Sequence, residues 1–427
     1  MKLKKNPFRP DKPVLTFEQF AGRSNELRVL VDSLYQIGHG NPMYKIVTGP
    51  RGIGKSSFVN QIQSLTTNHA DILNELNVDA GDFAFRFAVY KHIAAKGQTT
   101  ERIVLSLIRS MKNSISKDGA LKIIDEFLEN WKPTFGLPGG VAKLEYTGHS
   151  NSELSTDFIE ALNEVWTELR ADKDGIILVI DEVDTVAEDT DIASFLKVTT
   201  EQLAQSGLQQ VALYPVGITD AIEKLKSEHG SIGRVFETIE LMPMPPDECR
   251  EVINKTLQSE EGSRYVEITE SALDQVVQIS EGFPAIIHQL CYHAFRFDVD
   301  DSLDDADLTK AIRHVVTKVR RQELDRSLQA AGSGVNRQIV QAMAMHDELH
   351  VPLKDIATTI GKTSSQMSSH MKALQNRGAI DKIDRALYKI ADPLLRLYIR
   401  QMEEFGRPGF WGDGRQLRLP FSQEEGA

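Results

Sequence analysis

The chain has 427 residues, a length that accommodates two or three domains. Its composition, 41% hydrophobic and 26% charged, is that of an ordinary globular protein, and no run of about 18 apolar residues is present to cross a membrane. The formal net charge of -12 argues against a protein that coats nucleic acid with its whole surface.

The amino-terminal segment and the cysteines indicate the compartment. Residues 1–13, MKLKKNPFRPDKP, are basic but lack the apolar stretch of a secretory signal. The two cysteines, Cys249 and Cys291, form no metal-binding pair. We therefore predict a cytoplasmic protein without disulfides or zinc and without a membrane partner. Residues 1–19 are assigned to a basic amino-terminal arm.

The first functional pattern is a glycine-rich loop between a strand and a helix. YKIVT, residues 44–48, predicts a buried strand, and KSSFVNQIQSL predicts a helix that starts at Lys55. The pattern G-x-x-x-x-G-K-S between them is typical of a loop whose backbone N–H groups surround nucleotide phosphates. Lys55 would reach the β and γ phosphates, and the Ser56 hydroxyl would bind Mg²⁺. The predicted nucleotide-binding residues of this loop are Gly49, Pro50, Arg51, Gly52, Ile53, Gly54, Lys55, Ser56 and Ser57.

A second pattern adds catalytic chemistry. GIILVIDEVD, residues 175–184, is an apolar strand that ends in carboxylates. Asp181 would hold Mg²⁺ through its water shell, and Glu182 would orient and deprotonate the attacking water. The alternative is a buried strand followed by an acidic turn. Because parallel strands end at one edge of a sheet, these carboxylates are expected beside the phosphate loop.

A third strand is predicted at residues 208–219, LQQVALYPVGIT, and it ends at Thr219. At the same sheet edge, Thr219 would sense the γ-phosphate or position water. The helical sequence TDAIEKLK follows, so Thr219 is equally well explained as a helix cap.

The segment before the first strand carries a family resemblance. It is a loop that leads into an amphipathic helix, and its pattern is formed by Phe20, Gly22, Arg23, Glu26 and Leu27. This pattern resembles AAA+ ATPases related to origin-recognition proteins and to STAND signalling ATPases. The resemblance implies an α/β fold with a P-loop NTPase parallel sheet, a helical lid, and ATP with Mg²⁺ as cofactors. It also implies that the segment around Arg23 lies near the adenine.

The same resemblance extends to the predicted lid, residues 246–330. It implies that Arg234, shortly before the lid, reaches the γ-phosphate of a neighbouring subunit in a homo-oligomer; a surface arginine or an internal ion pair is the slightly preferred alternative. It also places Pro284 near the base, but proline is common in the first turn of any helix. His288 in the same helix is interpreted as a core histidine, and no arginine stands early in this helix as a second sensor.

The ATPase core is predicted at residues 20–245, with an insertion at about 91–155. The insertion contains amphipathic helices near residues 99–115 and 120–131, followed by a Gly/Pro-rich turn with short strands. It follows a strand predicted at residues 82–90.

Residues 331–405 are predicted to form a winged helix, followed by a tail at 406–427. Three helices are expected within residues 335–378, the last with Thr363 as its amino-terminal cap and Gly378 after its end, and a hairpin then follows. Residues 354–389 hold seven Lys or Arg against three Asp, so local charge favours double-stranded DNA. The predicted DNA-binding residues are Ser365, Gln366, Ser369, Lys372, Arg385 and Lys389. Protein contact or self-inhibition is the alternative use of such a module.

These patterns support three hypotheses. The first is an ATP-hydrolysing switch that oligomerises and engages DNA or a separate effector protein. The second is a DNA-binding regulator whose nucleotide is rarely hydrolysed. The third is a DNA-loaded recruiter for a mobile-element or phage-defence partner.

Overall fold

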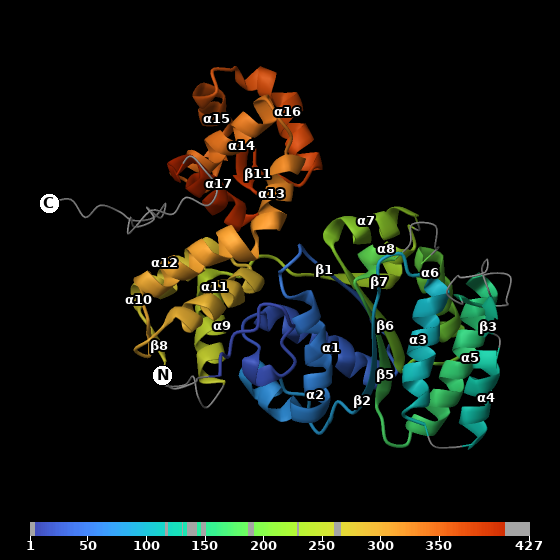
Figure 1. The fold of residues 1–427 in the computed structure, drawn as a ribbon. Coiled ribbons are helices and arrows are strands. Elements are labelled where there is room, and N and C mark those ends of the chain that lie inside the picture. The colour runs from blue at the N-terminus through green and yellow to red at the C-terminus, as the bar shows by residue number, and fades with distance from the viewer. Residues whose placement is uncertain are drawn as a thin grey trace. The chain divides into compact units, whose positions relative to one another are not determined.

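The computed structural model describes residues 5–115, 118–129, 131–134, 143–146, 151–186, 192–228, 230–259 and 266–405. The chain divides into two compact units (Figure 1). One unit is Pro13–Pro243, and the other combines Met1–Lys12 with Met244–Ala427. The division after residue 243 lies two residues from the predicted end of the core.

The Pro13–Pro243 unit is built on a five-stranded sheet in the order β2-β5-β6-β1-β7, in which every strand pairs in parallel with its neighbour. This confirms the predicted α/β class. The strands are β1 (Tyr44–Thr48), β2 (Phe87–Ile93), β5 (Gly175–Asp181), β6 (Val211–Gly217) and β7 (Phe236–Glu240). The helical segments around them are η1 (Phe17–Gln19), α1 (Ser24–Gly38), α2 (Lys55–Leu76), η2 (Val183–Thr185), α6 (Ile192–Gln205), α7 (Thr219–Glu228) and α8 (Ile232–Val235).

The central strands are apolar because helices cover both faces of the sheet (Figure 1). Every residue of β1, β5 and β6 is buried. Strand β2 begins later than predicted, at Phe87, because Phe85 has a left-handed backbone with φ of 50° and cannot continue an extended strand. Strand β6 ends at Gly217, so Thr219 is the first residue of α7 rather than the end of the strand.

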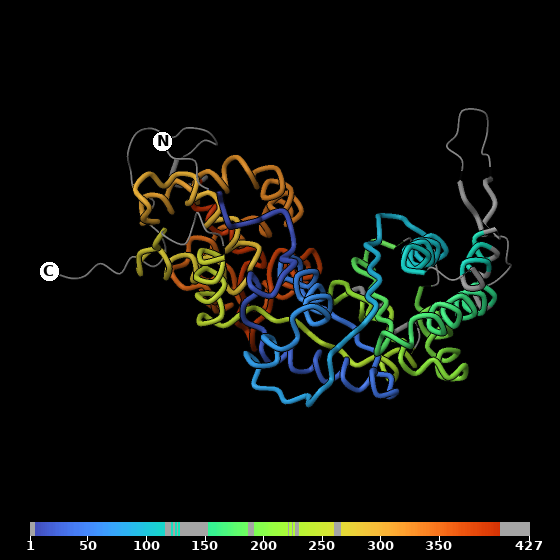
Figure 2. Tube along the Cα trace, turned by 90° about the horizontal axis from the view of Figure 1, so that it is seen from below, coloured from blue at the N-terminus to red at the C-terminus, as the bar shows by residue number. Residues whose placement is uncertain are grey.

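The insertion follows β2 and contains α3 (Thr100–Lys112), α4 (Asp118–Glu129), β3 (Trp131–Thr134), β4 (Lys143–Tyr146) and α5 (Asn151–Leu169). The predicted pair of helices and the short strands are confirmed. The two strands form an antiparallel pair in which Trp131 lies opposite Tyr146. Residues 135–142, at the predicted Gly/Pro turn, lie outside the described residues. In Figure 1, α3 to α5 lie on the opposite side of β2 from α1 and α2, and Figure 2 shows the same arrangement from below.

In the second unit, residues 246–330, which were predicted to be the lid, form a group of helices. They are α9 (Pro246–Gln258), α10 (Glu270–Ser280), α11 (Pro284–Phe297), α12 (Asp305–His314), the short π-helix η3 (Val315–Val319) and α13 (Arg321–Ala330). The two-residue strands β8 (Glu267–Ile268) and β9 (Ser302–Leu303) pair in parallel between them. The apolar face of α11 is buried in this group.

The carboxy-terminal part of this unit contains α14 (Val335–Met345), β10 (Val351–Pro352), α15 (Leu353–Thr359), α16 (Ser364–Asn376), β11 (Ile380–Asp384), β12 (Leu387–Ile390) and α17 (Pro393–Phe405). Its strands form an antiparallel sheet in the order β10-β12-β11. Thr363 caps α16 through a reciprocal capping box, and Gly378 follows the helix with φ of 65°, as the sequence predicts. The predicted tail, 406–427, lies outside the described residues.

The predicted basic arm, residues 1–19, is anchored in both halves of its described part. Residues up to Lys12 belong to the second unit, where Asn6 Nδ2 donates to the Tyr292 carbonyl at 2.8 Å. Phe8 is only 1% exposed and meets the His288 ring edge-on. In the other unit, Val14 N–H donates to Ser57 Oγ at 3.0 Å. The basic residues of this segment gave no signal of the anchoring, which depends on Phe8 and on backbone groups.

Truncation of Phe8 tests this anchoring. Phe8→Ala should lower the free energy of unfolding of the second unit by about 3 kcal/mol, because it leaves a cavity against His288. Hydrogen–deuterium exchange of α11 peptides measures the change. Val299→Ala is the control, because Val299 is 91% exposed. Equal protection of α11 in the two variants would contradict the structural role of residues 5–12.

Candidate nucleotide-binding site

The glycine-rich loop has the backbone that phosphate binding requires. It connects β1 to α2, and Gly49, Gly52 and Gly54 have φ values of 148°, 77° and 97°. These values are open to glycine and strained for other residues. The N–H groups of the first turn of α2 have no partner within the helix, so the loop and the positive end of the helix dipole present donors to an anion.

Lys55 of the phosphate loop lies near three carboxylates at the end of β5. Its Nζ donates to the carbonyls of Gly49 and Pro50 at 2.8 and 2.9 Å. Burial lowers the pKa of Lys55, while the carboxylates of Asp184, Asp181 and Glu182 act in the opposite direction. The predicted carboxylates are thus close enough to influence the loop lysine.

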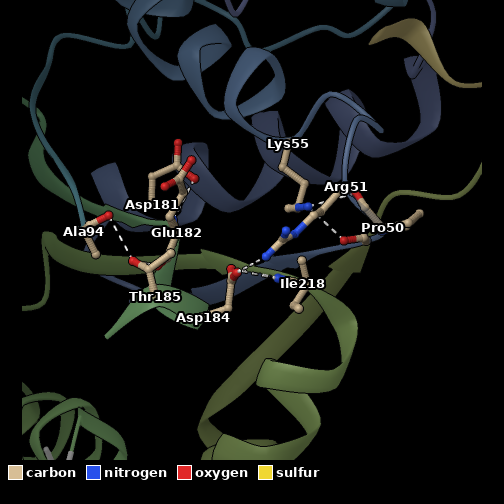
Figure 3. A network of polar contacts seen from close by, with 10 residues as sticks. Pro50, Arg51, Lys55, Ala94, Asp181, Glu182, Asp184, Thr185 and Ile218 are labelled. Carbon is tan, nitrogen blue, oxygen red and sulfur yellow. Dashed lines mark hydrogen bonds and ion pairs between the residues drawn. The ribbon is translucent and has the colours of Figure 1, made fainter. Parts of the chain in front are cut away.

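Figure 3 shows the carboxylates that follow β5 at the same sheet edge as Lys55 and Arg51. Asp181 ends the strand and is 2% exposed, whereas Glu182 is exposed. Glu182 has a left-handed backbone with φ of 59°, an uncommon conformation for a residue with a side chain. The left-handed turn interrupts the alternation of the strand and gives the two neighbouring carboxylates different environments.

Asp184 is a residue of this site that the sequence prediction missed. Its Oδ1 accepts the Ile218 N–H at 3.3 Å, and its Oδ2 lies 3.8 Å from a guanidinium nitrogen of Arg51 (Figure 3). Asp184 therefore connects the loop after β6 with the phosphate loop. The third carboxylate of the IDEVD sequence was the available signal, but its partners lie in loops that follow other strands.

Thr185 holds the second connection across the sheet edge. Its hydroxyl donates to the carbonyls of Ala94 and Glu182 at 3.0 and 2.8 Å, and its own carbonyl accepts the Gly97 N–H. The loop after β2 is therefore fastened to the turn that carries Glu182. Thr219, at the start of α7, is half-buried at this same edge.

Comparison with known proteins agrees with this geometry. Residues 19–211 match the AAA ATPase domain family. The sheet-bearing unit contains an AAA ATPase domain. The whole chain is 23% identical, over 95% of its length and 94% of the relative, to an uncharacterized HTH-type transcriptional regulator of Methanocaldococcus jannaschii. The resemblance to AAA+ ATPases that the sequence predicted is confirmed.

Two solved structures share the fold over nearly the whole chain. The Walker-type ATPase of Pyrococcus abyssi has a TM-score of 0.54 and 17% identity and covers 91% of this chain and 99% of its own. The ORC2 protein of Aeropyrum pernix, solved as ADPNP–ADP complexes, has a TM-score of 0.52 and 11% identity and covers 94% of this chain and 99% of its own. Within the described residues, no helix of the chain combines the length and apolar character needed to traverse a bilayer.

Some residues predicted to contact the nucleotide form hydrogen bonds with the backbone of the protein. Arg23 is 3% exposed, and its guanidinium donates to the carbonyls of Ile53 and Met242, so it braces the phosphate loop. The Ser57 hydroxyl accepts the Val14 N–H. Arg51, in contrast, is 84% exposed.

Arg234 lies in the short helix α8, where its side chain is exposed. No hydrogen bond or ion pair engages its guanidinium among the residues that the structure describes. The internal ion pair that the sequence left open is therefore absent from the described contacts, and the surface position remains.

Pro284 and His288 belong to the second unit. Pro284 is the first residue of α11, the position at which proline fits a helix best. His288 is buried in the same helix, and burial lowers its pKa to about 4, so it is neutral near pH 7. This agrees with the interpretation of His288 as a core residue.

The predicted DNA-binding residues divide into an exposed group and one half-buried exception. Ser365, Ser369 and Lys372 are exposed on α16, and Arg385 is exposed in the turn between β11 and β12. Gln366 is exposed as well, but its Oε1 accepts the Thr363 N–H in the capping box.

Lys389 is the exception. Its side chain is 12% exposed, and its Nζ donates to Glu281 Oε2 at 2.9 Å. Burial raises the pKa of Glu281, and the Lys389 ammonium opposes this rise. Lys389 therefore connects β12 to the turn before α11, and this ion pair engages the ammonium group that was predicted to contact DNA.

Two donor groups at this sheet edge suit a magnesium ion. Ser56 is in the first turn of α2, half-buried, and no hydrogen bond engages its hydroxyl in the described part of the chain. Asp181 brings a carboxylate to the same sheet edge. A hydroxyl ligand and a carboxylate that acts through bound water, together with phosphate oxygens, are the hard oxygen donors that Mg²⁺ prefers. The residues present therefore fit the ion.

A substitution at Gly49 tests the shape of the phosphate loop. An added Cβ would lie 2.6 Å from the Leu241 carbonyl oxygen, at a backbone φ of 148°. Gly49→Ala should lower the free energy of unfolding by about 3 kcal/mol, from strain and from this clash. Gly207→Ala is the control, because Gly207 also has a positive φ but no atom within 4 Å of the added Cβ. Its cost should be about 1 kcal/mol. If chemical unfolding gave the same loss of free energy for both variants, the loop would accommodate a Cβ at Gly49, which would contradict the prediction.

Proposed function

We propose that the protein binds ATP with Mg²⁺ and hydrolyses it, and that nucleotide state controls oligomerisation and the engagement of DNA or an effector protein. One observation carries this proposal: the phosphate loop, with Lys55, shares a sheet edge with Asp181 and Glu182. The AAA ATPase domain match supports nucleotide binding and suggests hydrolysis.

The carboxylates divide the chemical work because their environments differ. Glu182 is exposed on a left-handed turn, so it would accept a proton from a water that attacks the γ-phosphate. Lys55 would leave the carbonyls of Gly49 and Pro50 and hold the β and γ phosphates. Mg²⁺, held by Ser56 and Asp181, would supply the charge that neutralises the phosphate oxygens. Thr219 would detect the γ-phosphate from the start of α7.

Arg234 supports dependence of hydrolysis on assembly. Its guanidinium is exposed and has no partner among the described residues, so it is available to a second copy of the chain. An arginine supplied by a neighbouring subunit would stabilise charge in the transition state. We therefore propose a homo-oligomer in which Arg234 completes the site of the adjacent copy. Pro284 and the segment around Arg23 would lie near the base.

We further propose that residues 331–405 act as a winged helix on double-stranded DNA. The exposed side of α16 offers small hydroxyl side chains and Lys372, and Arg385 lies in the exposed turn of the hairpin. The HTH-type transcriptional regulator to which the chain is similar supports this use. A separate effector protein is the alternative partner of the same face.

A second candidate function is a nucleotide-gated regulator that does not hydrolyse ATP. The name of that relative, a transcriptional regulator, favours this candidate. It shares every binding feature of the first and differs only in the role of Glu182.

Turnover by a Glu182 variant separates the two functions. Glu182→Gln should lower kcat for ATP hydrolysis at least about 100-fold while ATP affinity is retained, because the variant loses the proton acceptor alone. Phosphate release is measured with and without double-stranded DNA. Glu223→Gln is the matched control, because Glu223 is an exposed glutamate on α7. A parent protein that is no faster than Glu182→Gln in either condition would refute hydrolysis and leave the regulator.

DNA titrations at several salt concentrations test the winged-helix proposal. Lys372→Ala and Arg385→Ala should each weaken binding to double-stranded DNA and reduce the salt slope by about 0.9, because each removes one phosphate contact. Lys96→Ala is the control for loss of one charge, since Lys96 is exposed in the ATPase domain. Affinity that ignores both salt and these substitutions would exclude DNA as the partner of α16.

A further inference from the structure

A lysine of β2 forms an ion pair with the carboxylate that we assign to magnesium binding. Lys91 Nζ lies 2.9 Å from Asp181 Oδ2, and the other oxygen of Asp181 accepts the Glu182 N–H at 3.0 Å. Both carboxylate oxygens are therefore engaged by the protein chain. Sequence patterns missed Lys91, because no motif surrounds it in strand β2.

The register of the sheet explains this contact. Strands β2 and β5 are parallel neighbours, with Lys91 opposite Val179 and Ile93 opposite Asp181. Side chains two residues apart in a strand point to the same face, so Lys91 and Asp181 share one face of the sheet. The long side chain of Lys91 spans the two-residue offset to the carboxylate.

Asn60 holds the ammonium from the other side. Its Oδ1 accepts a hydrogen bond from Lys91 Nζ at 3.2 Å, and its Nδ2 donates to the Val14 carbonyl at 3.0 Å. The bond to Val14 fixes the orientation of the amide, so that its oxygen faces the lysine. Asn60 is four residues after Ser56 in α2 and thus lies on the same side of that helix. The ammonium is therefore held between the proposed metal carboxylate and the helix that carries the other metal ligand.

The ion pair between Lys91 and Asp181 affects the binding of a metal ion at that carboxylate. Asp181 is almost fully buried, and a buried carboxylate without a counter-ion is strongly unfavourable, so the ammonium of Lys91 stabilises it. A divalent cation at the same carboxylate would face a positive charge within hydrogen-bonding distance of its ligand. The lysine and the metal ion therefore compete for Asp181.

We propose that Lys91 is a positioning residue that neutralises Asp181 before Mg²⁺ arrives and thereby sets the Mg²⁺ concentration at which ATP binds. The proposal rests on the nucleotide-binding function proposed above. It adds a resident cation, held by Asn60, that the incoming metal ion displaces.

Magnesium titrations of ATP binding test the competition. All proteins carry Glu182→Gln to prevent turnover, and binding of a fluorescent ATP is followed from EDTA to excess Mg²⁺. Lys91→Met should lower the half-saturating Mg²⁺ concentration about fivefold, because it removes the competing charge. ATP affinity in EDTA should stay unchanged. Lys91→Arg, which keeps the charge, should lie near the parent midpoint.

The control is Lys45→Met. Lys45 also pairs with a carboxylate on a neighbouring strand, Glu237 of β7. Lys45 is the second residue of β1, whereas the phosphate loop follows the other end of that strand. Lys45→Met should leave the half-saturating Mg²⁺ concentration unchanged. If Lys91→Met fails to fold, Lys91→Gln takes its place with the same expected shift. A folded variant with an unchanged or higher midpoint would overturn the role of Lys91 and leave ATP binding intact. Absence of ATP binding by the parent at every Mg²⁺ concentration would overturn both proposals.

Discussion

The parallel pairing of β5, β6 and β1 is the constraint on which the site depends. Because all three strands run in the same direction, the residues that follow them emerge at one edge of the sheet. The phosphate loop follows β1, Asp181 ends β5, and Thr219 begins the helix after β6. An antiparallel order would send alternate ends to opposite edges and separate these residues.

The edge is further tied together by side chains that bind the backbone of neighbouring loops. Asp184 accepts an N–H from the loop after β6, and Thr185 donates to the loop after β2. Arg23 performs the same task for the phosphate loop, through the Ile53 carbonyl. These residues position the polar groups around Lys55 because they satisfy backbone atoms that loops would otherwise leave to water.

The second unit uses charge in a different way. Glu281 lies in the turn before α11, and Lys389 lies on a strand of the carboxy-terminal module, 108 residues later in the chain. A second ion pair, Arg320 with Asp392 at 3.0 Å, also joins the segment between η3 and α13 to that module. Both pairs lie within one compact unit, although the sequence indicates two separate parts. For the more buried pair, Lys389 with Glu281, desolvation offsets much of the attraction, so it gives orientation more than stability.

Local pattern alone determined the phosphate loop, the strands β1, β5 and β6, the capped helix α16 and the nature of the ATPase domain. Each depends on residues close in the chain: glycines that permit a left-handed backbone, apolar runs that become buried strands, and caps that satisfy nearby N–H groups. Only the tertiary structure decided which charges meet. Lys91 reaches Asp181, Lys389 pairs with Glu281, and Arg23 braces the phosphate loop. Strand register and helix packing bring these partners together from distant parts of the chain.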